Sequence, residues 1–273
     1  MKSSFALSLF ITLLFIVVFK CATAQLNEVH NEWRAYFDKL NVKGSCVVYD
    51  LKKDKYHFYN RPQYTVQFTP ASTFKILNSL VALQVHAVPN ENVVLQWDGK
   101  DRGNEAWNKD TDMKTAFKNS TVWFYQELAR RAGEKHMKHY VEKSKYGNEN
   151  ISGGIDQFWL NGELRISPQQ QIEFLVKLYK NKLPFSRHNL EIVKNIMIQE
   201  DTMGYVLRGK TGWGTDMNRN IGWYVGYITR ENEVYFFATC IQDDAIENKN
   251  FSKSRTVITR QILRDLRILP PKE

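Results

Sequence analysis

The sequence predicts an α+β fold in which an antiparallel sheet, built from both chain ends and flanked by helices, is joined to a helical lobe. Runs rich in β-branched and aromatic residues lie near both ends of the chain, and helical periodicity dominates between them. We expect strands at residues 45–50, 55–60, 203–210, 221–229 and 233–242. The sheet lobe then includes about residues 25–65 and 200–273, and the mainly helical lobe about residues 66–199.

Two helices are placed by signals of their own. Ser167, Pro168 and Gln170 combine an N-cap, a first-turn proline and a capping box, which predicts that a helix begins at residue 168. A last amphipathic helix is expected at residues 252–268. Its apolar stripe, which must pack on another element, contains Val257, Ile258, Ile262 and Leu263.

Length and composition are those of a globular protein. Of the 273 residues, 43% are hydrophobic and 25% are charged, so a disordered chain, a collagen-like repeat and a disulfide-dense mini-scaffold are excluded. The formal net charge is +9, but the basic residues stand in short groups such as Lys52–Lys53 and form no long run. We therefore expect a mild attraction for anionic small molecules and no nucleic-acid partner.

The first 24 residues have the pattern of a secretory signal peptide. Lys2 precedes an apolar run at residues 5–19, and Ala22-Thr23-Ala24 is a small-x-small cleavage site. Lys20 ends the run before it reaches the roughly 20 apolar residues that a membrane-spanning helix needs. We expect cleavage near Ala24-Gln25, a single domain at residues 25–273, no stable membrane anchor, and a periplasmic or secreted location.

Two cysteines follow that segment, and each lies in a predicted strand. We interpret Cys46 and Cys240 as small buried side chains. A disulfide between them is the alternative, and Cα atoms more than about 7 Å apart would exclude it.

The histidines form no recognisable metal or triad motif. His136 and His139 lie three residues apart on a charged helical stretch with no third ligand nearby in the sequence, so we expect no metal site. No local catalytic context surrounds the others, which are His30, His57, His86 and His188. Since a Gly-x-Ser-x-Gly turn is also missing, the sequence disfavours a Ser-His-Asp hydrolase.

A serine and a lysine three residues apart form the strongest candidate site. Pro70 suits the first helical position, so Ser72 falls in the first turn, where free backbone N–H groups favour an anion beside the hydroxyl. Lys75 follows on the same helix face, within reach of the hydroxyl. A serine nucleophile needs such an adjacent base.

Lys75 can act as a base only when its amine is neutral, and a lysine with the ordinary pKa of about 10.4 is protonated at pH 7. Its apolar neighbours Phe74, Ile76 and Leu77 predict desolvation, which lowers the pKa of a buried lysine by about 3–5 units. The neutral amine then serves directly, or it adds carbon dioxide and becomes a carbamate that requires a hydrogen-bond donor nearby.

A Ser-x-x-Lys pattern occurs about once by chance in a chain of this size, so its weight depends on the segments that follow it. Ser120-Thr121-Val122 follows a helical stretch, Tyr146-Gly147-Asn148 ends a charged helix, and Trp159-Leu160 lies in an apolar island. Lys210-Thr211-Gly212 ends a predicted strand, where glycine allows close approach and the side chains before it can donate to a carboxylate. Ser-x-x-Lys with Lys-Thr-Gly is a signature of penicillin-recognising enzymes.

With these motifs the sequence resembles the class D serine β-lactamases, the oxacillinase-type members of the penicillin-recognising serine enzymes. The resemblance covers nearly all of the chain after residue 24 and includes Trp97-Asp98-Gly99 and residues 125–130. It implies a β-lactamase/transpeptidase-like fold and hydrolysis of small β-lactam substrates through an acyl-enzyme. Two departures, Trp123-Phe124 after the Ser-x-Val motif and Trp213 after Lys-Thr-Gly, leave the chemistry intact and bear on the substrate range.

The resemblance implies a catalytic role for five residues. Ser72 is acylated, and Lys75, as N6-carboxylysine formed with carbon dioxide or bicarbonate, is the general base; no other cofactor is implied. Trp159 holds the carbamate through its indole N–H. Ser120 passes a proton to the ring nitrogen, and Lys210 adds positive charge there.

Further residues are implied to bind substrate or to shape the cleft. Thr211 and Arg255 bind the substrate carboxylate, and the backbone N–H groups of Ser72 and Trp213 form the oxyanion hole. Val122 and Leu160 form an apolar roof over the carbamate. The remaining residues of this set are Gly212 and Tyr146.

Two alternatives share the same fold. A penicillin-binding transpeptidase, or the β-lactam-binding sensor domain of a signalling receptor, would be acylated without rapid turnover. A receptor needs a long membrane-embedded portion before its sensor, whereas a cleavable signal precedes this domain, so we expect the hydrolase. The sequence leaves the substrate spectrum and the oligomeric state open.

Overall fold

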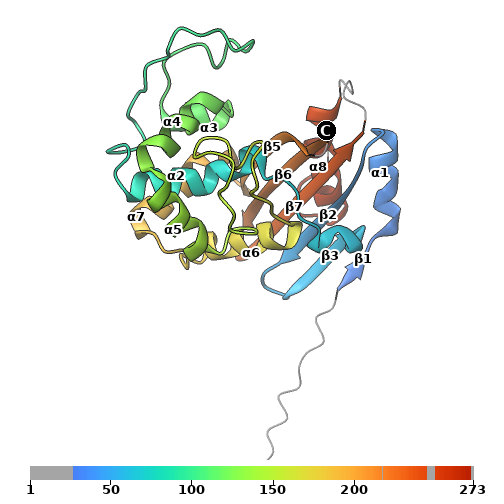
Figure 1. Ribbon diagram of the computed structural model, residues 1–273. Helices are drawn as coiled ribbons and strands as arrows, with labels where there is room; N and C mark the ends of the chain where they lie inside the picture. Colours follow the sequence, from blue (N-terminus) through green and yellow to red (C-terminus); the bar gives the residue numbers. More distant parts are fainter. Residues whose placement is uncertain (1–26, 217, 245–249, 272–273) are drawn as a thin grey trace, which may run out of the picture.

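A seven-stranded sheet lies at the centre of the computed structural model, which describes residues 27–216, 218–244 and 250–271 (Figure 1). The strand order is β1-β3-β2-β7-β6-β5-β4. The strands are β1 Glu28–Val29, β2 Lys43–Asp50, β3 Lys55–Tyr59, β4 Ile198–Asp201, β5 Val206–Asp216, β6 Arg219–Arg230 and β7 Glu233–Asp243. All neighbouring pairs are antiparallel except β1 with β3, which is parallel, so the sheet is mixed rather than wholly antiparallel as expected. The expected signal peptide lies outside the described residues.

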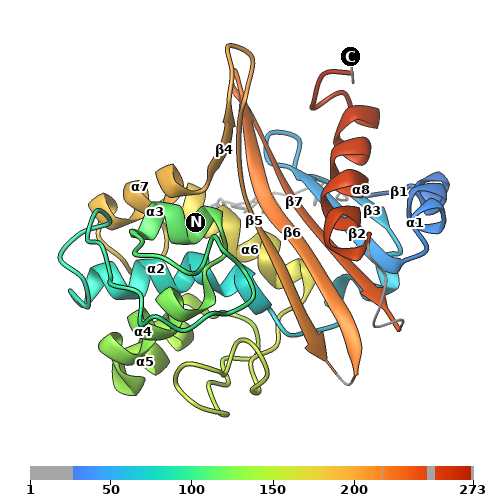
Figure 2. The ribbon, with the colours of Figure 1, turned by 90° about the horizontal axis from the view of Figure 1, so that it is seen from above.

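Helices cover both faces of the sheet. The α-helices are α1 Arg34–Lys39, α2 Lys75–Gln84, α3 Met113–Lys118, α4 Val122–Ala132, α5 Glu134–Ser144, α6 Pro168–Tyr179, α7 Arg187–Ile196 and α8 Phe251–Asp265. The 3-10 helices are η1 Asn31–Trp33, η2 Arg61–Thr65 and η3 Ala71–Phe74. Figure 2 shows α1 and α8 on one side of the sheet and the remaining α-helices on the other. In the part of the chain that the structure describes, no helix is both long and apolar enough to cross a membrane.

The packing explains why the chain forms these layers. One buried cluster joins the sheet to α1 and α8 through residues such as Phe37, Phe237 and Ile262. A second, larger cluster joins the opposite face to the helical lobe. Val257, predicted to belong to the buried stripe of α8, is 51% exposed, because a residue next to Ile258 points about 100° away from it around the helix.

Two further sequence predictions concern α6 and the lobe boundary. The capping box at Ser167 and Gln170 is confirmed, and α6 begins at Pro168 as predicted. This helix, placed in the helical lobe, nevertheless packs on the sheet, since the Tyr179 ring contacts the rings of Tyr227 and Phe236. The two lobes therefore share one continuous core.

The two cysteines are both buried and both free, so the alternative of a disulfide is wrong. Cys46 on β2 pairs with Thr239 of β7, while Cys240 pairs with Ser45. Because neighbouring residues of a strand point to opposite faces, the two thiols belong to the two different core clusters.

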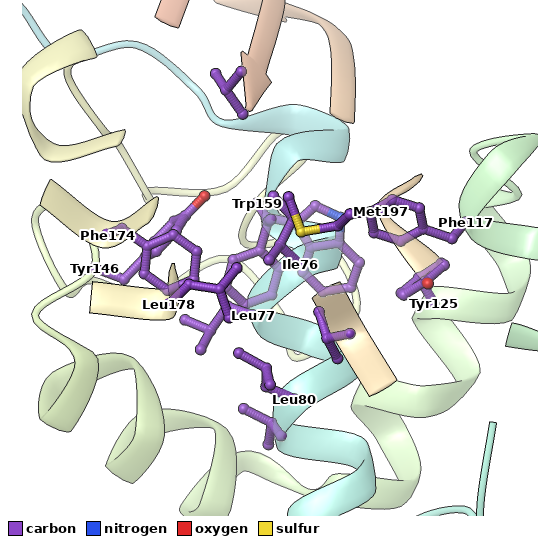
Figure 3. Packing of buried hydrophobic residues seen from close by; sticks show 14 of the residues in the cluster. Ile76, Leu77, Leu80, Phe117, Tyr125, Tyr146, Trp159, Phe174, Leu178 and Met197 are labelled. Carbon is purple, nitrogen blue, oxygen red and sulfur yellow. The ribbon is translucent and has the colours of Figure 1, made fainter. Parts of the chain in front are cut away.

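Helix α2 runs through the middle of the helical lobe. Every residue from Lys75 to Leu83 is buried, as is typical of a helix surrounded by other elements. Figure 3 shows Ile76, Leu77 and Leu80 of this helix among aromatic and aliphatic side chains from several other segments. Helix α2 therefore brings whatever polar group it carries at its first residue into a dry environment.

Candidate active site

The candidate nucleophile lies where the loop before α2 tightens into η3. Ala71 has φ +47°, a left-handed conformation that is unusual for a non-glycine residue and is often kept at functional sites. Thr73 secures the turn, since its backbone N–H and its hydroxyl both donate to Pro70 O, at 3.2 and 2.8 Å. Pro70 is the residue before the first turn rather than its first member, and Ser72 still occupies that turn.

Ser72 and Lys75 are in direct contact, as the sequence predicts. Lys75 Nζ lies 2.9 Å from Ser72 Oγ. Ser72 is 7% exposed and Lys75 is fully buried. Burial lowers the pKa of Lys75 to about 7, because a charged amine loses its hydration there. A large fraction of the amine is therefore neutral at neutral pH and can accept the hydroxyl proton.

Trp159 packs on Phe74, the residue before Lys75, and its indole N–H donor is unpaired among the described residues. The indole is fully buried, and its ring stacks on Phe74 with centroids 5.3 Å apart. Its Nε1 has no hydrogen-bond acceptor among the described residues, although a buried N–H is nearly always paired. Figure 3 shows Trp159 packed beside Ile76 and Met197 in the core around α2. An anionic group on Lys75 is the kind of acceptor that this donor lacks.

A second serine–lysine pair comes from different parts of the chain. Lys210 of β5 donates from Nζ to Ser120 Oγ and to Thr211 O. Ser120 has φ +55°, so the loop before α4 holds it in a left-handed conformation. The pKa of Lys210 lies well below its ordinary value, chiefly because of burial and then because of the positive charges of Lys75 and Arg255. The two serine–lysine pairs therefore share one electrostatic environment.

Strand β5 lies against η3, and a glycine makes this approach possible. A Cβ at Gly212 would meet Pro70 O at 3.0 Å and Thr73 Cγ2 at 3.2 Å. The sequence predicted that Lys210-Thr211-Gly212 ends a strand, whereas β5 continues to Asp216. The correction has a simple cause, since β6 pairs with β5 along its whole length.

Beyond the glycine, β5 presents an exposed aromatic ring. Trp213 is 51% exposed, and its indole donates to Asn220 Oδ1 at 3.1 Å, which fixes the ring. Thr211, two residues earlier, is partly exposed. These two positions border the approach to Ser72 because β5 packs on η3.

Arg255 supplies a guanidinium with free donors. It lies in the first half of α8, and its Nε and Nη1 are buried with no acceptor among the described residues. Burial lowers the pKa of Arg255 to about 10, and the group still carries its charge at pH 7. Its charge also acts on Lys210, so the two cations lie in the same region. A substrate carboxylate would satisfy such donors.

The remaining predicted site residues, Val122, Leu160 and Tyr146, differ in how far they are buried. Val122 begins α4 and Leu160 follows Trp159, and both are partly buried, as a wall of the site would be. Tyr146 is fully buried, and its role in shaping the substrate cleft stays a prediction. Its hydroxyl lies 3.5 Å from Thr73 Oγ1, and it therefore supports the turn of the nucleophile from behind.

Sequence reasoning missed several supporting residues. Gln171 of α6 donates to Thr73 Oγ1 at 2.9 Å, and Thr69 Oγ1 lies 3.2 Å from the carbonyl oxygens of Trp159 and Leu160. The Tyr125 ring lies 5.2 Å from Lys75 Nζ. These contacts join segments that are distant in the chain, so no local sequence pattern predicts them.

The fold and this arrangement match known proteins. Residues 44–264 match the family described as penicillin binding protein transpeptidase domain. The probable beta-lactamase YbxI of Bacillus subtilis is 47% identical over 213 residues, which cover 78% of this chain and 79% of the relative. Beta-lactamase OXA-48 of Klebsiella pneumoniae is 39% identical over 249 residues, which cover 91% of this chain and 93% of the relative.

Solved structures agree with the sequence comparisons. The class D beta-lactamase YbXI from Nostoc aligns with a TM-score of 0.84 at 46% identity, over 88% of this chain and 100% of that one. The C-terminal domain of the BlaR penicillin receptor of Bacillus licheniformis aligns with the same TM-score of 0.84 at 34% identity. The alignment covers 90% of this chain and 99% of that domain. The fold and site thus define a penicillin-recognising serine enzyme of the transpeptidase family. Within that family, the chain belongs to the class D β-lactamases.

We expect Arg255→Ala to weaken substrate recognition more than chemistry. Loss of a hydrogen bond to a charged group costs about 1.5–3 kcal/mol, so kcat/KM for a penicillin should fall roughly 10- to 100-fold, mostly through KM. Lys253→Ala, which removes an exposed positive charge from the same helix, is the matched control and should stay near the parent value. Equal losses in both variants, or a loss confined to kcat, would show that Arg255 does not bind the carboxylate.

Proposed function

We propose that this protein is an exported hydrolase that opens the β-lactam ring of penicillin-type antibiotics through a Ser72 acyl-enzyme and thereby gives resistance to them. The observation that carries the proposal is the 2.9 Å contact between Ser72 Oγ and a fully buried Lys75 amine. Family membership supports the substrate class, since YbxI and OXA-48 are β-lactamases by name. The apolar run and small-x-small site within residues 1–24 support export.

Acylation uses the two serine–lysine pairs in turn. The base at Lys75 takes the hydroxyl proton while Ser72 Oγ forms a bond to the lactam carbonyl carbon. Backbone N–H groups of Ser72 and Trp213 stabilise the negative charge on the carbonyl oxygen, a kind of contact worth about 2.7–4 kcal/mol for each donor. The C–N bond then breaks, and Ser120 gives its proton to the ring nitrogen while it takes one from Lys210, which donates a hydrogen bond to it.

Substrate orientation depends on the cations around this centre. Two buried guanidinium nitrogens of Arg255 have no acceptor within the described part of the chain, and the charge of Arg255 acts on Lys210. A penicillin carries a carboxylate next to its ring nitrogen. Binding of that carboxylate by Arg255 and Thr211 sets the lactam carbonyl against Ser72, which lowers the barrier through positioning.

Hydrolysis of the acyl-enzyme requires a base that activates water, and we propose that Lys75 is carboxylated for this purpose. A carbamate would supply an anionic general base in place of the amine. Three observations support the fit: Lys75 is fully buried, its pKa of about 7 keeps much of the amine neutral and reactive toward carbon dioxide, and no described residue supplies an acceptor for Trp159 Nε1. Trp159 would hold the modified side chain, while Val122 and Leu160 would limit the entry of water.

A β-lactam sensor is the second candidate function. The observation in its favour is the similarity to the C-terminal domain of the BlaR penicillin receptor, which covers 90% of this chain. A sensor would form the same acyl-serine and keep it. The two functions therefore differ in the lifetime of the adduct.

Time-resolved mass spectrometry with a penicillin separates the two functions. The hydrolase should show a transient adduct on Ser72 and release many product molecules for each enzyme, and nitrocefin turnover should give the same result. Ser72→Ala should lose both the adduct and the turnover, whereas Ser252→Ala, a serine of the last helix, should keep both. A single equivalent of product with an adduct that persists would contradict the hydrolase and favour the sensor.

The carbamate has a test of its own. Trp159→Phe keeps an aromatic ring and removes the indole N–H, so it should lower turnover roughly tenfold or more by removing a charge-assisted hydrogen bond. Excess bicarbonate should restore part of the activity by mass action. Trp33→Phe, which alters an equally buried indole against the α1 and α8 side of the sheet, should show neither effect. Full activity in Trp159→Phe, or a loss that bicarbonate leaves unchanged, would refute the carbamate.

A further inference from the structure

Two histidines and a glutamate meet at the outer edge of the sheet. Strand β1 pairs with β3 in parallel register, which places Glu28 opposite His57. His30 follows β1 directly, and its side chain turns to the same place. The imidazoles are largely covered, with side-chain exposures of 18% for His30 and 13% for His57, while the Glu28 side chain is 48% exposed. The catalytic machinery uses none of these residues.

The three groups have the spacing of metal ligands. His30 Nε2 lies 3.0 Å from His57 Nδ1, and Glu28 Oε2 lies 3.1 Å from His57 Nδ1 and 3.6 Å from His30 Nε2. Bonds of about 2.0–2.1 Å to a tetrahedral zinc ion place neighbouring ligand atoms about 3.3–3.4 Å apart. The triangle formed by the three atoms therefore matches one face of such a tetrahedron.

Glu32 and Trp33 orient the His30 imidazole so that its Nε2 atom can bind a metal ion. Glu32 Oε1 lies 2.8 Å from His30 Nδ1 and accepts a hydrogen bond from it, so a neutral His30 has its lone pair on Nε2, the atom that faces the other two groups. A carboxylate behind a histidine is a typical support for a metal ligand. The His30 ring also stacks on Trp33 with centroids 4.2 Å apart and 9° between the planes, which fixes its direction.

Lys55 bears on the site in two opposed ways. It forms an ion pair with Glu28 Oε1, which holds the carboxylate so that Oε2 faces the imidazoles. Its positive charge also lowers the attraction for a cation. Because Lys55 repels any cation, the site favours an ion that bonds strongly to imidazole nitrogen over an ion that is held by charge alone. This excludes Ca²⁺ and Mg²⁺, which prefer several oxygen ligands.

We propose that Glu28, His30 and His57 bind a divalent transition-metal ion of the zinc type, with water at the fourth position. The ion would join the segment at the start of the described chain to β3. That segment has little other support in the sheet, since β1 has two residues and both are exposed. Metal binding should therefore stabilise the folded protein, because the ligands come together only when β1 and β3 pair.

The experiment is a titration of the chelator-treated full protein with zinc chloride, followed by calorimetry and by thermal unfolding. We expect one ion per chain and a rise in Tm that saturates at that ratio. Cobalt chloride should give the visible absorption of a tetrahedral Co²⁺ complex, which zinc then abolishes. His57→Gln should remove all three signals, while His188→Gln, at an exposed histidine on α7, should leave them intact.

Two other variants keep the test decisive if His57→Gln does not fold. Glu28→Gln removes the ligand charge and should abolish tetrahedral cobalt absorption. Glu32→Gln leaves all three ligands in place and should weaken zinc binding about 10- to 100-fold without a change in stoichiometry. Failure of the parent protein to bind zinc, or binding that survives in Glu28→Gln and His57→Gln, would overturn the proposal. The nitrocefin assay is independent of this result and tests only the proposed hydrolysis.

Discussion

The burial of the Lys75 amine is the constraint on which the rest of the site depends. Helix α2 is buried along nearly its whole length, and Lys75 at its first residue has no exposed surface. Desolvation alone lowers its pKa to about 7. A site that could not keep this amine out of water would have no base beside Ser72, because an ordinary lysine stays protonated at neutral pH.

The structure around Ser72 and the buried Lys75 amine holds the other groups of the site in place. Gly212 lets β5 approach η3, and this contact sets Lys210 and the strand backbone beside the nucleophile. Burial and then the positive charges of Lys75 and Arg255 lower the pKa of Lys210, and the basic groups gathered here attract an anionic substrate. The sheet lobe supplies Lys210 to the candidate active site, and the helical lobe supplies Ser72 and Lys75. The site therefore lies where the two lobes meet and share one core.

Local sequence patterns predicted those features that depend on neighbours in the chain. The Ser72–Lys75 pair follows from helical spacing, and the start of α6 follows from its capping box. Features that depend on distant segments were missed or misplaced, such as the burial of Tyr146 and the extension of β5 by its partner β6. The pairing of His57 with the segment around His30 is of the same kind, since parallel strand register brings together residues that show no common motif.

The most direct test of the central claim is the pKa of Lys75 in the folded protein. Lysine labelled with ¹³C at Cε can be followed by NMR as the pH changes, in buffer free of carbon dioxide, with Lys75→Ala used to assign the signal. The account predicts a titration near pH 7, separate from the other lysines. A Lys75 signal that titrates above about pH 10 with the exposed lysines would contradict it.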